Sequence, residues 1–280
     1  MKLTIAALLL SCCIASDSSD STDSDYRQHV AQLKRELPTG FHVFVQKPFV
    51  VIGDDDPEVV EKWARGTVKW TVDRVKKQYF KRDPKQIVDI WLFKNKTSYE
   101  KHCKSIVGYD PHTPYGFYSS THHAIIMNIS TGGGTLVHEI VHPFIENNFE
   151  DCPSWFNEGL ASLYEQCRDK DGKIWGSTNW RLRGLQFEIK SDSLPTFKEL
   201  CETTTREFYD GERGDNYAQA RYLCYFLQEK GLLNKYYHAF RTNVKRDPSG
   251  YGTLVQILGE SDMGEFEARW KKYCLGLRFP

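Results

Sequence analysis

The residues best suited to chemistry are two histidines four positions apart, His138 and His142, with Glu139 directly after the first. Side chains four positions apart on an α-helix lie on the same face, so both imidazoles can reach one metal ion. The carboxylate of Glu139 then lies beside that ion, where it can take a proton from water. This spacing predicts a zinc site on a helix, with Glu139 as the general base.

A catalytic zinc site needs a third protein ligand and one position left open for water. Glu158 is the best candidate, because its segment is otherwise apolar and a buried carboxylate costs free energy unless it is paired or metal-bound. A turn between Asn147 and Pro153 would fold this segment back onto the histidine helix. The alternative is an ordinary exposed glutamate. The apolar neighbours are Trp155, Phe156, Leu160 and Ala161.

The elements that position these residues form two halves. Before the motif, hydrophobic patterns predict alternating strands and helices, and after it they predict mainly helices. The fold class expected is α+β, a mixed β-sheet with helices followed by an all-helical C-terminal half. Pro143 is expected to kink the metal helix or end it early. The expected strands are 41–53 (one or two strands), 87–93, 115–118 and 123–129; the expected helices are 58–80, 98–107, 154–165, 217–230, 233–242, 251–258 and 266–275.

The N-terminus has the pattern of an export signal. Lys2 precedes a short apolar run and small residues up to Ser16, which is too short to span a membrane. Residues 9–12 also resemble a bacterial lipobox, so ordinary cleavage near Ala15 and a lipid anchor at Cys12 both stay open. Either outcome places the protein outside the cytoplasm, as a secreted, periplasmic or lipid-anchored surface protein.

The chain is expected to divide after the metal helix. The expected parts are a signal peptide at 1–16, a disordered Ser/Asp linker at 17–25, an α/β subdomain at 26–146 and a helical subdomain at 147–280. Lys+Arg and Asp+Glu both number 37, which argues against a general binder of nucleic acid or anionic membranes. Export also makes one to three disulfides plausible among the cysteines outside the signal. These are Cys103, Cys152, Cys167, Cys201, Cys224 and Cys274.

The segments 138–142 and 155–161 together resemble the zinc-binding segments of the gluzincin metallopeptidases, in the style of the peptidase MA-like families. They are more distantly similar to the aminopeptidase N family, whose third ligand lies in a W-x-N-E-G-x-A segment. The resemblance covers about residues 115–232. It implies a thermolysin-like catalytic domain with one catalytic Zn²⁺ and a peptide or protein substrate. The ligands implied are His138, His142 and Glu158.

The resemblance also assigns a role to Tyr217. In the related families a helix after the third ligand begins with a tyrosine whose hydroxyl faces the zinc site, and residues 216–222 match it. By that resemblance Tyr217 donates a hydrogen bond to the developing oxyanion, while Glu139 takes a proton from the attacking water and delivers it to the leaving amine. Two alternatives stay open, that Tyr217 is a core aromatic or that His238 is the donor.

The strand at 123–129 is the expected edge for an extended substrate, with Ala124, Ile126 and Asn128 as substrate-binding residues. The aminopeptidase N family has a G-x-M-E-N segment whose glutamate holds the substrate's amino group, and the corresponding place here has no glutamate. This departure favours an endopeptidase over an aminopeptidase. A second departure is Ser162, where thermolysin-type gluzincins have an aspartate that orients a zinc-bound histidine, so that partner must come from elsewhere.

The leading hypothesis is an exported zinc-dependent metallopeptidase. One alternative is a non-catalytic exported binding protein that keeps the peptidase fold. Another is a zinc amidase acting on a non-peptide bond, such as one in a cell wall. The presence of Glu139 favours an enzyme, because a decayed site often loses its base. No nucleic acid partner is expected.

Overall fold

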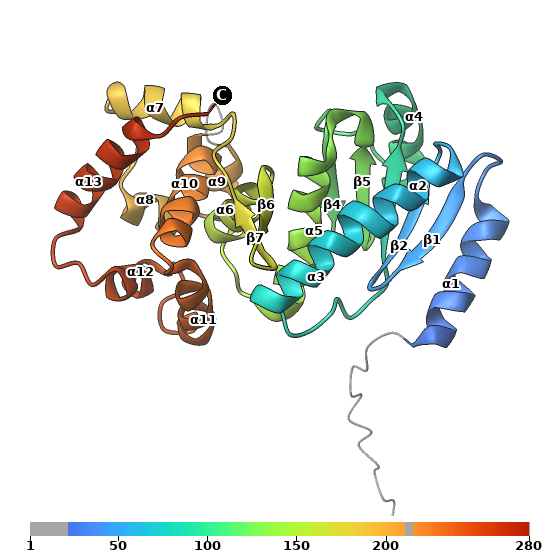
Figure 1. The fold of residues 1–280 in the computed structure, drawn as a ribbon, viewed down its shortest axis with the longest axis horizontal. Helices are drawn as coiled ribbons and strands as arrows, with labels where there is room; N and C mark the ends of the chain where they lie inside the picture. Colours follow the sequence, from blue (N-terminus) through green and yellow to red (C-terminus); the bar gives the residue numbers. More distant parts are fainter. Residues whose placement is uncertain (1–21, 211–214, 280) are drawn as a thin grey trace, which may run out of the picture.

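The computed structural model describes residues 22–210 and 215–279. The expected signal peptide, Cys12 and residues 17–21 of the expected linker lie outside this part of the chain. Among the helices described, none has both the length and the apolar character needed to cross a membrane. The chain forms an α/β half (residues 22–148) and a helical half (residues 154–279), which lie side by side at the right and left of Figure 1.

The α/β half is built on a mixed five-stranded sheet in the order β1-β2-β3-β5-β4. The central strands β2, β3 and β5 run parallel, and β1 and β4 run antiparallel to their neighbours at the two edges. The central strands are almost wholly apolar, as expected of parallel strands covered on both faces. The strands are β1 (His42–Gln46), β2 (Phe49–Gly53), β3 (Val88–Phe93), β4 (Gly116–Ser119) and β5 (Ala124–Asn128).

Helices cover both faces of this sheet (Figure 1). Because side chains alternate along a strand, Val51 and Ile90 contact the main core with α3 and α5, whereas Val50 and Ile126 face α1 and α4. The expected helix at 58–80 contains a π-helical turn. The helical elements are α1 (Asp23–Glu36), α2 (Pro57–Trp63), η1 (Ala64–Val68), α3 (Lys69–Gln78), α4 (Lys96–Val107), η2 (Ile129–Thr131) and α5 (Gly133–Asn148).

The helical half begins with α6, which packs along α10 and returns towards α5. A small antiparallel hairpin, β6–β7, follows α6 and contacts α3 of the other half. The elements are α6 (Ser154–Leu163), β6 (Cys167–Lys170), β7 (Lys173–Gly176), α7 (Leu182–Lys190), α8 (Phe197–Glu202), α9 (Thr205–Asp210), α10 (Asp215–Glu229), α11 (Leu233–Asn243), α12 (Tyr251–Leu258) and α13 (Met263–Gly276).

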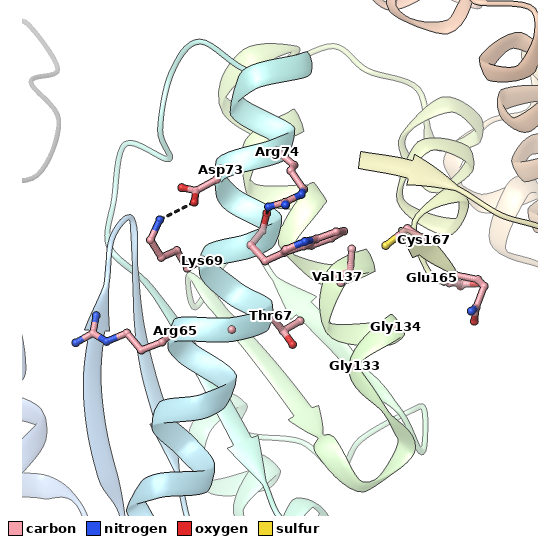
Figure 2. A pocket seen from close by; sticks show the side chains of 13 residues that line it. Arg65, Thr67, Lys69, Asp73, Arg74, Gly133, Gly134, Val137, Glu165 and Cys167 are labelled. Atoms are coloured by element: carbon pink, nitrogen blue, oxygen red, sulfur yellow. Dashed lines mark hydrogen bonds and ion pairs between the residues drawn. The ribbon is translucent and has the colours of Figure 1, made fainter. Parts of the chain in front are cut away.

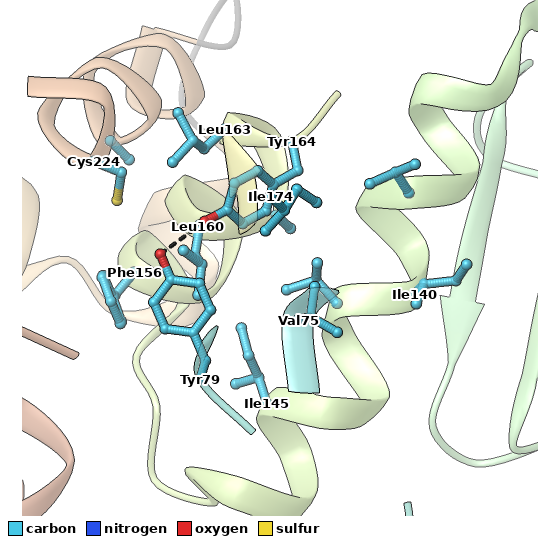
Figure 3. Packing of buried hydrophobic residues seen from close by; sticks show 14 of the residues in the cluster. Val75, Tyr79, Ile140, Ile145, Phe156, Leu160, Leu163, Tyr164, Ile174 and Cys224 are labelled. Atoms are coloured by element: carbon cyan, nitrogen blue, oxygen red, sulfur yellow. Dashed lines mark hydrogen bonds between the residues drawn. The ribbon is translucent and has the colours of Figure 1, made fainter. Parts of the chain in front are cut away.

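The two halves share one continuous hydrophobic core. Val75 and Ile145 of the α/β half face Phe156 and Leu160 of α6, as Figure 3 shows. The hydroxyls of Tyr79 and Tyr164 meet across this boundary at 2.7 Å, so the polar atoms of two buried rings are paired. The position of α6 relative to α5 is therefore fixed by packing as well as by the short chain connection between them.

Of the two effects expected of Pro143, a kink or an early end, the early end is wrong, because the metal helix runs past Pro143. α5 continues to Asn148 although a proline inside a helix removes one hydrogen bond and costs about 3 kcal/mol. The next two residues, Phe144 and Ile145, are buried, and full burial of such side chains contributes roughly 1.5–3 kcal/mol each. Burial of this last turn thus offsets the cost of the proline.

Three further expectations need correction. The C-terminal half is not all-helical, because it contains the antiparallel β6–β7 hairpin. The linker does not extend to residue 25, because α1 begins at Asp23 with Thr22 and Asp25 forming a capping box. The six cysteines, all within the described residues, are free thiols rather than disulfides.

Candidate metal centre

α5 and α6 bring the predicted ligands together. The chain turns between Phe149 and Pro153, and the backbone N–H groups of Phe156 and Asn157 bond to the Pro153 carbonyl at the start of α6. Oε2 of Glu158 then lies 3.1 Å from Nε2 of His138 and 4.0 Å from Nε2 of His142. The turn expected between residues 147 and 153 is therefore present, and it places α6 so that Glu158 points towards both imidazoles.

The donor set fits a divalent cation. Oε2 of Glu158 is buried and has no hydrogen-bond partner within the described residues, although two imidazole nitrogens face it. A buried carboxylate oxygen without a partner is costly, and a cation shared with the two imidazoles would satisfy it. Two histidines and one carboxylate are a donor set that zinc takes at catalytic sites.

Glu139 also comes close to the two histidines. One ligand atom from each of His138, Glu139 and His142 lies within 4.8 Å of the others, so distance alone would allow Glu139 as the carboxylate ligand. We favour Glu158, because its Oε2 lies close to the Nε2 atoms of both histidines. Glu139 makes such a contact only with His142, at 3.8 Å, and its carboxylate also accepts a backbone hydrogen bond from Tyr118. A metal ion held by Glu158 and the two histidines would have the Glu139 carboxylate beside it.

The other ring nitrogen of each histidine faces an oxygen atom from the helical half. Nδ1 of His142 lies 2.9 Å from Oδ1 of Asn157, and Nδ1 of His138 lies 3.4 Å from Oε1 of Glu165. The Asn157 contact is a hydrogen bond that favours a proton on Nδ1 of His142 and leaves its Nε2 free for a metal. Nδ1 of His138 is buried and makes no hydrogen bond among the described residues, so Glu165 acts on it as a nearby charge. These two contacts supply the orientation that Ser162 cannot, since Ser162 has no carboxylate.

Glu165 is itself held by a dense set of hydrogen bonds. Arg181 donates to both of its oxygens, at 2.7 and 2.9 Å, and Asn179 donates a third bond at 2.9 Å. Burial alone would raise the pKa of Glu165, but Arg181 and His138 outweigh burial and lower it to about 2. Glu165 is therefore a fixed anion behind His138.

The two glutamates of the centre differ in basicity. Burial raises the pKa of Glu139 to about 8, against the opposing influence of His138. Burial acts the same way on Glu158, but His142, His138 and the Tyr209 hydroxyl outweigh it and lower the pKa of Glu158 to about 2. A carboxylate that remains ionised suits a ligand, and one with a raised pKa suits a general base near neutral pH.

The two histidines are affected in opposite directions. Burial would lower the pKa of His138, but Glu158 and Glu165 outweigh it and raise that pKa to about 10. Burial, the largest influence on His142, lowers its pKa despite the carboxylate of Glu158. Both histidines therefore respond to carboxylates supplied by the helical half.

A cleft of about 1280 Å³ opens over these residues. Tyr115 and the edge strand β4 form one side, and Trp180, Tyr209 and Tyr217 of the helical half form the other. The strand expected to bind substrate, β5, is not an edge, because it pairs with β3 and with β4. The substrate-binding role expected for Ala124, Ile126 and Asn128 is therefore corrected, since all three are buried and the free edge belongs to β4.

Tyr217 lines the cleft, as the resemblance implies, and its ring lies 5.1 Å from the guanidinium of Arg181. Within the described residues its hydroxyl makes no hydrogen bond to protein, and the residue lines the cleft. The alternative donor, His238, lies on α11 and is not among the residues that line the cleft.

Tyr209 and Glu165 were missed by sequence reasoning. The Tyr209 hydroxyl donates a 2.6 Å hydrogen bond to Oε1 of Glu158, and burial together with that carboxylate raises the pKa of Tyr209, which keeps it protonated. Glu165 follows Glu158 by seven residues, two helical turns, a spacing that could have suggested a shared face. No local pattern singles out Tyr209.

A second cavity of about 720 Å³ lies behind the centre, between α3 and the first turn of α5. Figure 2 shows Gly133 and Gly134 of α5 opposite Glu165 and Cys167. A methyl group on Gly134 would come within 2.1 Å of the Glu165 carbonyl oxygen. Glycine at this position therefore permits the close approach of the two halves at Glu165.

The sequence was also compared with known proteins. No protein-family model matches it, and no curated protein is significantly similar to it. A functional assignment therefore depends on the geometry of the site itself.

Proposed function

We propose that this chain is an exported zinc-dependent endopeptidase with a thermolysin-like, gluzincin type of catalytic domain. The observation that carries the proposal is the position of Glu158, whose buried Oε2 a separate helix brings to 3.1 and 4.0 Å from the imidazoles of His138 and His142, with no hydrogen-bond partner among the described residues. Glu139 beside them and the open cleft above them supply a base and room for a substrate. The N-terminal sequence pattern, which is typical of an export signal, is the basis for proposing an extracytoplasmic location.

His138, His142 and Glu158 would hold the zinc ion. When bound, zinc lowers the pKa of a water molecule and polarises a carbonyl group. Glu139 accepts a proton from the attacking water molecule while the water oxygen bonds to the carbonyl carbon. It then delivers that proton to the amine nitrogen as the C–N bond breaks. The Tyr217 hydroxyl donates a hydrogen bond to the carbonyl oxygen while it carries negative charge.

The cleft fits an extended peptide. Residues of β4 and the loop before it line one wall, so a peptide can add its backbone beside this free edge. The sequence lacks the glutamate that holds the substrate's amino group in the aminopeptidase N family, which supports cleavage within a chain over removal of an N-terminal residue.

The test is replacement of Glu139 by glutamine. We expect Glu139→Gln to keep one zinc per chain, measured by elemental analysis, and to lower kcat/KM on a peptide library by about 100-fold or more, the usual contribution of a general base. Glu100→Gln, a change to an exposed glutamate on α4, is the matched control and should alter neither.

Each arm of this test can contradict a separate part of the proposal. A wild-type chain without zinc would exclude the metal centre. Stoichiometric zinc with no cleavage of any peptide would instead contradict the peptidase activity and favour a binding protein or a non-peptide amidase. Full activity in Glu139→Gln would exclude Glu139 as the base.

A further inference from the structure

Two tyrosines of the helical half lie beside Glu158, and they make different contacts. The hydroxyl of Tyr209 bonds to Oε1 of Glu158 at 2.6 Å, within the range of a strong charge-assisted hydrogen bond. The hydroxyl of Tyr217 has no protein partner within the described residues, although the two rings lie only 6.2 Å apart. One hydroxyl is thus occupied by the metal-facing carboxylate and the other is available to the cleft.

The contact of Tyr209 decides how the Glu158 carboxylate is turned. The two oxygens face different partners. Oε1 accepts the hydrogen bond from the Tyr209 hydroxyl, and Oε2 faces the imidazoles of His138 and His142. The terminal torsion of a glutamate is broad and roughly two-fold, so it does not fix this orientation by itself. Among the described residues, Tyr209 supplies the one hydrogen bond that Oε1 accepts.

Tyr209 can act in this way because α9 is firmly anchored. Thr204 and Glu207 cap each other at its start, and the Asn216 side chain donates to the carbonyls of Glu207 and Phe208 at its end. Phe208 is buried, with its ring 5.1 Å from that of Tyr217. The ring of Tyr209 is half exposed, so the short helix does not depend on the Tyr209 hydroxyl for its place.

We propose that Tyr209 is a positioning residue that holds the Glu158 carboxylate towards the metal, while Tyr217 acts on the substrate. This inference rests on the proposed function, because it takes Glu158 as the third ligand. Tyr209 then helps to keep the metal bound, and the neighbouring Tyr217 stabilises the oxyanion. Loss of the Tyr209 hydroxyl leaves Oε1 buried without a partner and frees the carboxylate to turn away from the imidazoles.

Two matched substitutions on the full chain test this division, Tyr209→Phe and Tyr217→Phe. Zinc affinity is measured by competition with a chromogenic chelator, with no peptide present. We expect Tyr209→Phe to weaken zinc binding about 10- to 100-fold, the usual effect of removing a partner of a metal ligand, with activity recovered by added zinc. Tyr217→Phe should leave zinc affinity unchanged and lower kcat about 100- to 1,000-fold at saturating zinc.

A double-mutant cycle separates positioning from a general loss of structure. In the Glu158→Ala background, which removes the acceptor of the Tyr209 hydrogen bond, Tyr209→Phe should have little further effect on zinc affinity, because its action passes through that carboxylate. An additive loss would show that Tyr209 acts otherwise and overturn the inference. Unchanged zinc affinity in Tyr209→Phe would also overturn it and leave the proposed function intact, whereas a wild type that binds no zinc would overturn both.

Discussion

The two halves of the molecule contribute to the centre in different ways. The α/β half supplies His138, Glu139 and His142 from just over one turn of a single helix, together with the edge strand β4. The helical half supplies Glu158, Asn157, Glu165, Arg181, Tyr209 and Tyr217, which come from α6, α9, α10 and the segments between them. The first contribution is local in sequence, and the second exists only when the chain is folded.

This difference shows where the precision of the site lies. A helix alone sets the spacing of two imidazoles, but it does not set their tautomers or the place of a third ligand. Those depend on Asn157, Glu165 and Glu158, whose positions follow from the packing of α6 against α5. The metal-facing geometry is therefore a property of the boundary between the halves.

The largest expected effect comes from forcing that boundary apart. Gly134→Ala places a methyl group 2.1 Å from the Glu165 carbonyl oxygen, a backbone atom of the segment that directly follows α6. Overpacking of this kind costs about 1–3 kcal/mol, and we expect the upper end of the range here. Urea denaturation should show the loss of stability, and chelator competition should show weakened zinc binding in the same variant.

Gly184→Ala is the matched control for this clash. Gly184 lies in α7, where an added methyl group would meet no atom within 4 Å. Alanine is favoured over glycine in a helix, so this variant should be neutral or more stable by about 0.5–1 kcal/mol. Normal stability and zinc affinity in Gly134→Ala would show that the boundary can relax and does not govern the site.

Much of the α/β half could be predicted from its pattern. The central strands are apolar runs, and the helices between them have regular apolar faces, so strands at 87–93 and 123–129 were predicted close to their actual bounds. The hairpin β6–β7 was missed because most of its first strand is exposed and polar. The order of the strands could not be predicted, and this is why β5, rather than β4, was taken as the edge.

The site shows the same limit. Glu158 could be predicted because an acidic residue among apolar neighbours needs a partner, and the sequence offers two histidines nearby. Tyr209 is 51 residues from Glu158 in the chain and lies on a short helix without a strong pattern, so only the fold shows their contact. Tyr209 itself therefore carries no periodic or spacing signal.

The partners of the two histidines offer a finer test of the helical half. Glu165→Gln removes the anion behind His138 and leaves Arg181 without its carboxylate, so zinc affinity should fall about 10- to 100-fold. Asn157→Ala removes a neutral partner of His142, so the loss of zinc affinity should lie at the lower end of that range. Chelator competition on both variants measures the difference, and a larger loss in Asn157→Ala would contradict the greater weight given to the anion.

The smallest expected effect lies in the α/β half, away from the boundary. His29 of α1 contacts Asp89 of β3 at 2.7 Å; the hydrogen bond to Asp89 raises the pKa of His29 above 6.5, and burial raises that of Asp89. A raised folded-state pKa gives stability that is complete below the unfolded value of 6.5 and is lost as pH rises through the folded value. Because the pair is partly exposed, the loss should stay below about 1 kcal/mol. Urea denaturation at a series of pH values above 6.5 should show this loss of stability in the wild type but not in His29→Gln. The ratio of the zinc affinities of the two proteins should not change with pH. A ratio that varied with pH would mean that the α1 contact, as well as the boundary between the halves, controls the centre.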